Sequence, residues 1–192
     1  MDLDQSKTPL FDAVKKYVDD KVIQFHVPGH KQGRGLPEFR DYIGEKVLQM
    51  DVNGMDDLDY LNHPTGVILE SQRLLANAFN ADEAFFLVNG TTAGVQAMIM
   101  SVLNPRDKII LPRNAHKSAV GGIILSNAIP VYVQPEINQQ VGIAMGVTVE
   151  SIKRAIKENP DAKAVFLINP TYYGAASDLK SIVRIAHSNG MI

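Results

Sequence analysis

The sequence predicts an α/β fold whose sheet is mostly parallel and flanked by helices. From residue 84 onward, short apolar runs alternate with segments that have helical period. Runs this apolar and about five residues long are typical of strands that are covered on both faces. Because each run is followed by a helical segment, the order favours parallel strands joined by right-handed crossovers.

Four strands and four helices account for this alternation. The predicted strands are Ala84–Val88, Lys108–Leu111, Ile129–Val133 and Ala164–Ile168. The predicted helices are Thr91–Leu103, His116–Ser126, Val149–Glu158 and Asp178–Ser188. Asn189-Gly190 favours a helix end, and Met191-Ile192 then begins another apolar run. We therefore interpret the chain as the front portion of a longer protein.

The first 80 residues have a different pattern, rich in helices and loops. Helices are predicted at Pro9–Asp20, Leu36–Gln49 and Val67–Phe79. The segment Gln24–Gly35 contains a proline and three glycines, so it is predicted to be irregular. We divide the chain into an N-terminal arm, residues 1–80, and the first part of an α/β domain, residues 81–192.

Composition excludes several classes of function. The 192 residues carry a net charge of −2, which favours neither nucleic acid nor an anionic membrane surface as a partner. No cysteine is present, so disulfides and thiolate metal sites are excluded. The chain has neither a signal-peptide pattern nor an apolar run of membrane-spanning length. We therefore expect a cytoplasmic protein.

The segment 84–103 predicts an anion site. An apolar run breaks at Asn89-Gly90, and a helix opens on Thr91 and Thr92. Such a corner directs free backbone N–H groups and the positive end of a helix dipole at one point, which suits a phosphate. It is neither a Walker A loop nor a dinucleotide fingerprint. An ordinary helix capped by threonine produces the same pattern, and this alternative stays open.

Two more predicted strand ends carry polar groups. Arg113–Ser118 contains His116, which could stack on a planar ring or move protons, and Lys117, a candidate amine. Asn169–Gly174 contributes Thr171 and two tyrosine hydroxyls. Ligands bind at the carboxyl ends of strands in open α/β sheets. A solvated turn and a Pro-Gly loop are the alternatives, and each is favoured when its segment is taken alone.

An acidic loop at residues 51–66 is a fourth candidate site. Asp56, Asp57, Asp59 and His63 could ligate a metal, but their spacing matches no recognised motif. We favour a solvated loop and expect no metal.

Four motifs together resemble a known family. They are Phe25-His26-Val27-Pro28-Gly29-His30-Lys31, Asn89-Gly90-Thr91-Thr92, Arg113-Asn114-Ala115-His116-Lys117-Ser118 and Asn169-Pro170-Thr171-Tyr172-Tyr173-Gly174. In order and spacing they resemble the ornithine/lysine/arginine decarboxylases, which are pyridoxal-phosphate (PLP) enzymes with the aspartate-aminotransferase-like fold (PLP fold type I). The resemblance runs from about Thr8 to the end, so it implies the large domain of that fold, truncated.

The resemblance implies roles for individual residues. Gly90, Thr91 and Thr92 would hold the cofactor phosphate, and His116 would lie against the pyridine ring. Thr171 would hydrogen-bond near the phenolic oxygen of the cofactor, with Ser118 as a polar neighbour. The segment Pro28–Lys31 would belong to an arm that helps form a homodimer with shared active sites. The Schiff-base lysine and the aspartate facing the ring nitrogen fall outside this chain, and we reject Lys117 as a substitute.

The implied reaction is decarboxylation of arginine, lysine or ornithine to an amine for polyamine biosynthesis. We favour arginine, although no specificity pocket is identifiable, and a short biosynthetic type of enzyme, because no receiver-like domain precedes the match. The chain alone is expected to be inactive. A PLP-dependent aminotransferase and a non-catalytic, truncated phosphate-binding module are the alternatives.

Overall fold

The computed structural model describes residues 3–192, which form two compact units, one ending at Phe86 and the other spanning Leu87–Ile192. Helices make up the first unit: α1 (Pro9–Asp19), α2 (Pro37–Ile43), α3 (Glu45–Gln49) and α4 (Val67–Ala78). α1 packs on α4, and the backbone N–H of Leu10 donates to Ser71 Oγ at 3.2 Å. The predicted helix Leu36–Gln49 is wrong as one element, because Gly44 (φ +96°) separates α2 from α3.

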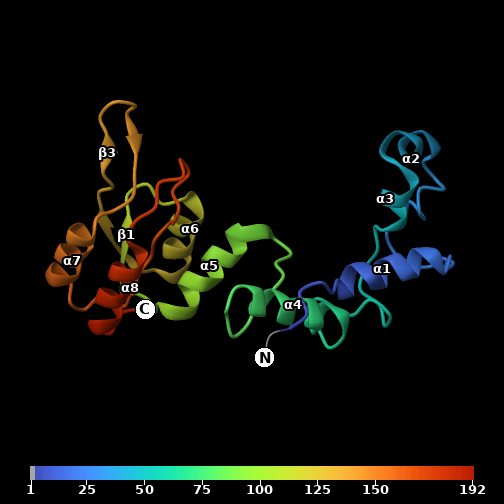
Figure 1. Cartoon of the computed structure of the whole chain (residues 1–192), viewed down its shortest axis with the longest axis horizontal. Helices are drawn as coiled ribbons and strands as arrows, with labels where there is room; N and C mark the ends of the chain where they lie inside the picture. The colour runs from blue at the N-terminus through green and yellow to red at the C-terminus, as the bar shows by residue number, and fades with distance from the viewer. Residues whose placement is uncertain (1–2) are drawn as a thin grey trace. The chain divides into compact units, whose positions relative to one another are not determined.

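The second unit is an α/β structure, as predicted (Figure 1). Its helices are α5 (Gly90–Val102), α6 (Lys117–Ser126), α7 (Val149–Glu158) and α8 (Leu179–Ser188). Its main sheet has the order β2 (Ile129–Val133), β1 (Lys108–Pro112), β5 (Ala164–Val165), and both pairings are parallel. The aligned pairs Ile110–Val131 and Ile110–Val165 place β1 at the centre.

Consecutive residues of β1 point into two separate apolar clusters. Ile110 packs with residues of α7 and α8, including Ile152 and Ile182. Ile109 packs on the opposite face with residues of α5 and α6, including Ile99. The two helix pairs therefore cover opposite faces of the sheet, which explains why β1 is apolar from Ile109 to Pro112.

α5 and α6 cross at very close range. A Cβ built on Gly122 would lie 3.0 Å from Ile99 Cδ1 and 3.1 Å from Ile99 Cβ. The glycine therefore sets how near the two helices approach.

The predicted strand Ala84–Val88 is wrong: no strand forms there, and Phe85 and Val88 are exposed. An apolar run becomes a strand only when a neighbouring strand takes up its backbone hydrogen bonds, and none of the described strands pairs with this one. Met191 and Ile192, in contrast, begin strand-like pairing. Ile192 N–H donates to Lys163 O at 3.0 Å, and Val165 N–H donates to Ile192 O at 2.9 Å.

A small hairpin was not predicted from the sequence. It consists of β3 (Ile137–Asn138) and β4 (Ile143–Ala144), which pair antiparallel. The Asn138 carbonyl accepts from Gly142 N–H at 2.7 Å and its side chain accepts from Gln140 N–H at 2.9 Å, so one residue closes the turn. In Figure 1 the hairpin and the loop after β5 extend from the same end of the unit.

Candidate functional site

The candidate site is a cavity of about 600 Å³ in the second unit. Three segments line it. They are the loop after β1, the loop that follows β5, and the β3–β4 hairpin. Because β1 and β5 are parallel, their carboxyl ends meet at one edge, and the two loops meet there as predicted. The lining residues are Asn114, His116, Gly142, Ile143, Ala144, Ile168, Pro170, Thr171, Tyr172 and Tyr173.

His116 is held at the start of α6 as its N-cap. Its Nδ1 accepts the backbone N–H of Ser118 at 3.2 Å and lies 2.8 Å from Ser118 Oγ. Because Nδ1 accepts, the neutral ring carries its proton on Nε2. Ser118 itself is buried and is absent from the cavity lining, so it acts on the site through His116.

Thr171 is buried at the base of the second loop. Its hydroxyl oxygen accepts from Ala175 N–H at 3.2 Å, and its own N–H donates to Ala175 O at 2.8 Å. The hydroxyl hydrogen is therefore available to a ligand in the cavity. The structure thus brings two of the predicted cofactor residues, His116 and Thr171, to one cavity.

The predicted phosphate corner forms the first turn of α5. Gly90 has φ +67°, and no side chain caps the helix, so the first N–H groups are not engaged by Asn89 Oδ1. Gly90, Thr91 and Thr92 are exposed and are absent from the cavity lining. Their role in phosphate binding stays a prediction. Lys117 is the exposed first residue of α6 and does not line the cavity.

The acidic loop of the first unit is not uniformly solvated, which corrects the sequence-based interpretation. Asp59 is only 6% exposed, and its carboxylate accepts the backbone N–H groups of Tyr60, Thr65, Gly66 and Ile68 at 2.7–3.1 Å. Burial raises the pKa of Asp59, but these hydrogen bonds outweigh it and lower the pKa to about 2.

The Asp59 carboxylate is therefore occupied by hydrogen bonds from backbone N–H groups. Asp56 and Asp57 remain exposed. Within residues 3–192 no three His, Asp or Glu side chains gather as a metal site would need.

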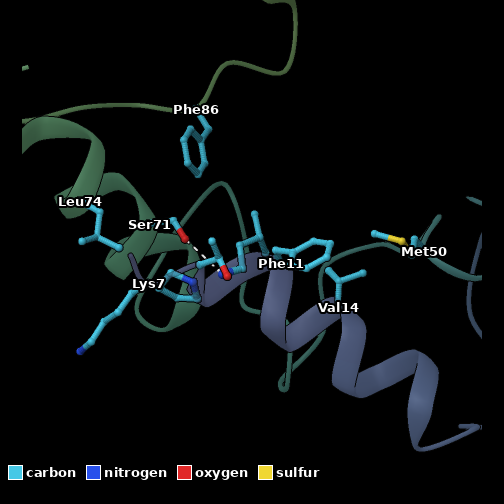
Figure 2. Close-up of a pocket in the computed structure, with 10 residues that line it drawn as sticks. Lys7, Phe11, Val14, Met50, Ser71, Leu74 and Phe86 are labelled. Carbon is cyan, nitrogen blue, oxygen red and sulfur yellow. Dashed lines mark hydrogen bonds between the residues drawn. The ribbon is translucent and has the colours of Figure 1, made fainter. Parts of the chain in front are cut away.

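A second cavity, of about 490 Å³, lies in the first unit (Figure 2). Its walls are mostly apolar, with Phe11 and Val14 from α1, Leu74 from α4 and Phe86 from the end of the unit. None of the predicted site residues lines it. In the described part of the chain, no helix combines the length and apolar character needed to cross a membrane.

Sequence reasoning missed the wall formed by the hairpin, since strands of two residues have no periodicity to detect. Gly142 after a polar turn segment was the only signal of a reversal. The two tyrosines after Thr171 were noted for their hydroxyls, not as walls of a cavity.

Comparison with known proteins gives a family match over most of the chain. A family model described as Orn/Lys/Arg decarboxylase, major domain, matches residues 8–192. The chain is 50% identical to an arginine decarboxylase of Bacillus subtilis over 187 residues, which are 97% of this chain and 38% of the relative. The chain therefore spans well under half the length of that relative.

Solved structures show the same similarity. Lysine decarboxylase A from Pseudomonas aeruginosa is 30% identical, with a TM-score of 0.72, over 85% of this chain and 24% of that one. The lysine decarboxylase LdcF of Francisella novicida, 24% identical, has a TM-score of 0.81 over 92% of this chain and 27% of that one, and shows the same fold.

Proposed function

The chain belongs to the Orn/Lys/Arg decarboxylase family, and from that premise we propose that the full-length protein decarboxylates a basic amino acid with PLP as cofactor. Arginine is the favoured substrate, because the relative at 50% identity is named an arginine decarboxylase. The amine product would then enter polyamine biosynthesis.

The observation that carries the proposal is the shared cavity of His116 and Thr171 at the carboxyl edge of the sheet. Its donor set is an imidazole ring, a hydroxyl with a free hydrogen and the amide of Asn114. These groups, around about 600 Å³, fit a flat heteroaromatic ring with polar substituents. The fit supports PLP independently of the family name.

When bound, PLP supplies an electron-accepting ring for the electron pair that remains after carbon dioxide departs. The chain's own residues have positioning roles. His116, fixed through Nδ1 by Ser118, would lie flat against the ring and set its plane. Thr171 would donate its hydroxyl hydrogen near the phenolic oxygen of the cofactor, and the first N–H groups of α5, at Gly90, Thr91 and Thr92, would hold the phosphate.

The test uses the full-length protein loaded with PLP and supplied in turn with arginine, lysine and ornithine. We expect carbon dioxide and the matching amine, most rapidly with arginine. A matched pair, His116→Phe and His116→Ala, separates stacking from packing, since phenylalanine keeps a ring over the cofactor. We expect the alanine variant to lose more PLP affinity than the phenylalanine variant.

Two outcomes would contradict the proposal. Transfer of the amino group to a 2-oxo acid without carbon dioxide release would make the protein an aminotransferase. Absence of any turnover, with phosphate binding retained, would make it a non-catalytic module.

We also propose a homodimer or larger homo-oligomer for the full-length protein. The first unit exposes several large apolar side chains, among them Phe25, Tyr42 and Phe79, which is typical of a surface that is covered in an assembly. Sedimentation of the full-length protein tests this, and a monomer at micromolar concentration would contradict it.

A further inference from the structure

Two adjacent tyrosines at the tip of the loop after β5 are unusually exposed for aromatic side chains. Tyr172 is 98% exposed and Tyr173 is 60% exposed. Their ring centroids lie 5.8 Å apart with an interplanar angle of 85°. The edge-to-face arrangement leaves ring faces open at nearly right angles to each other.

The base of this loop is fixed, so the tyrosines are presented at a defined place. Gly174 N–H donates to Thr171 O at 2.9 Å, and its φ of +80° closes the turn. Ser177 N–H donates to Asn169 Oδ1 at 2.8 Å, which ties the two ends of the loop together. These bonds, with the Thr171–Ala175 pair, hold the base of the loop on both sides of the two tyrosines.

Both tyrosines line the same cavity as His116 and Thr171, and no carboxylate lines that cavity. A cationic group entering it therefore meets aromatic faces and neutral oxygens in this part of the protein. A cation over the face of a tyrosine is attracted by the ring quadrupole, most strongly where water is excluded.

The same unit already contains such a contact. The Arg113 guanidinium carbon lies 4.8 Å from the centroid of the Tyr132 ring. Arg113 follows β1 and Tyr132 lies in β2, so this sheet already pairs a guanidinium with a tyrosine face.

We infer that the Tyr172–Tyr173 pair receives the cationic end of the substrate side chain and so contributes to the choice of substrate. The inference rests on the proposed function and deepens it. Because a planar guanidinium stacks on aromatic faces better than a compact, strongly hydrated ammonium, the pair favours arginine over lysine and ornithine.

The test compares Tyr172→Leu, Tyr172→Phe, Tyr173→Leu and Tyr173→Phe in the full-length PLP-loaded protein. Kinetics are measured with arginine, with lysine and with citrulline, the uncharged isostere of arginine. We expect each leucine variant to raise KM for arginine about 2- to 5-fold, in the range of a cation–π contact at an exposed site. The phenylalanine variants should change KM for arginine less than about 1.5-fold, because the ring is kept.

The selectivity ratio distinguishes this role from a structural one. In the leucine variants the ratio of kcat/KM for arginine to kcat/KM for citrulline should fall. The corresponding ratio for lysine to citrulline should fall less. Ile124→Ala, at a 72% exposed side chain of α6 that does not line the cavity, is the control and should leave both ratios unchanged. A side chain as exposed as Tyr172 contributes little packing, so its leucine variant should fold, which the visible absorbance of bound PLP verifies.

Unchanged selectivity ratios in active, folded leucine variants would overturn the inference and leave the proposed function intact. A wild-type protein that releases no carbon dioxide from any basic amino acid would overturn both.

Discussion

The two units of the chain reach order by different physical means. The second unit is organised by apolar side chains that alternate across one strand, with Ile110 buried against α7 and α8 and its neighbours buried against α5 and α6. In the first unit the loop before α4 is organised by one carboxylate, Asp59, which accepts several backbone N–H groups. Packing of the first kind is visible in sequence patterns, whereas a hydrogen-bond hub of the second kind is not.

The largest expected effect tests the apolar side of this comparison. Ile110→Ala in the full-length protein should lower the free energy of unfolding by about 2–5 kcal/mol. Ile110 is fully buried, so the substitution leaves a void in the core. Urea denaturation followed by circular dichroism measures it. The matched control is Ile124→Ala on the exposed side of α6, where the loss should be below about 1 kcal/mol. Equal losses at both positions would contradict the described core.

The next effect tests the polar side. Asp59→Asn removes one charged acceptor oxygen and should cost about 1–3 kcal/mol of unfolding free energy, because backbone N–H groups, that of buried Ile68 among them, lose their partner. Asp57→Asn, at an exposed position of the same loop, is the matched control and should cost less than about 0.5 kcal/mol. If the Asp59 variant were as stable as its control, the loop would not depend on that carboxylate.

The pH dependence of the stability difference between wild type and Asp59→Asn tests whether the ionised carboxylate stabilises the loop. The pKa of Asp59 is lowered from 3.8 to about 2 in the folded chain, so its stabilising contribution is fully present above pH 4 and is lost as the pH falls toward 2. We expect the stability gap between wild type and Asp59→Asn to be constant from pH 7 to about 4.5 and to shrink below it. A gap that widened on acidification would show that the carboxylate is protonated more readily in the folded chain than in the unfolded one.

The smallest expected effect is no effect at all. Residues 1–192 incubated with PLP and reduced with borohydride should carry no modification at Lys117 by mass spectrometry, since Lys117 is exposed and outside the cavity lining. The same fragment should release no carbon dioxide from arginine. Stoichiometric labelling of Lys117 would overturn its assignment as a neighbour of His116 that forms no covalent bond with the cofactor.

The sequence was sufficient where a single local pattern determines an element. The run that became β1 is buried at four of its five positions, and the buried residues of α7, Ile152, Ala155 and Ile156, recur at helical spacing. The run at residues 84–88 has the same composition, yet it forms no strand, because a strand requires a partner that its own sequence does not contain.

The candidate site divides in the same way. His116 and Thr171 were predicted to converge because the carboxyl ends of parallel strands share an edge, and both line one cavity. The hairpin wall and the open faces of Tyr172 and Tyr173 could not be predicted, since they depend on how separate loops fold toward each other. Asp59 was predicted as one of several solvated acids, and only its surroundings distinguish it from Asp56.

The close contact between Gly122 and Ile99 links two places that the sequence keeps apart. α6 begins beside His116 and α5 begins at Gly90, so the spacing between those two helix starts depends on how deeply the helices interlock midway along their lengths. A methyl group added at Gly122 would push α5 and α6 apart. It would thereby change the distance between His116 and Gly90 without contacting either residue. Gly122 would then determine the distance between two parts of the candidate site without contacting a ligand itself.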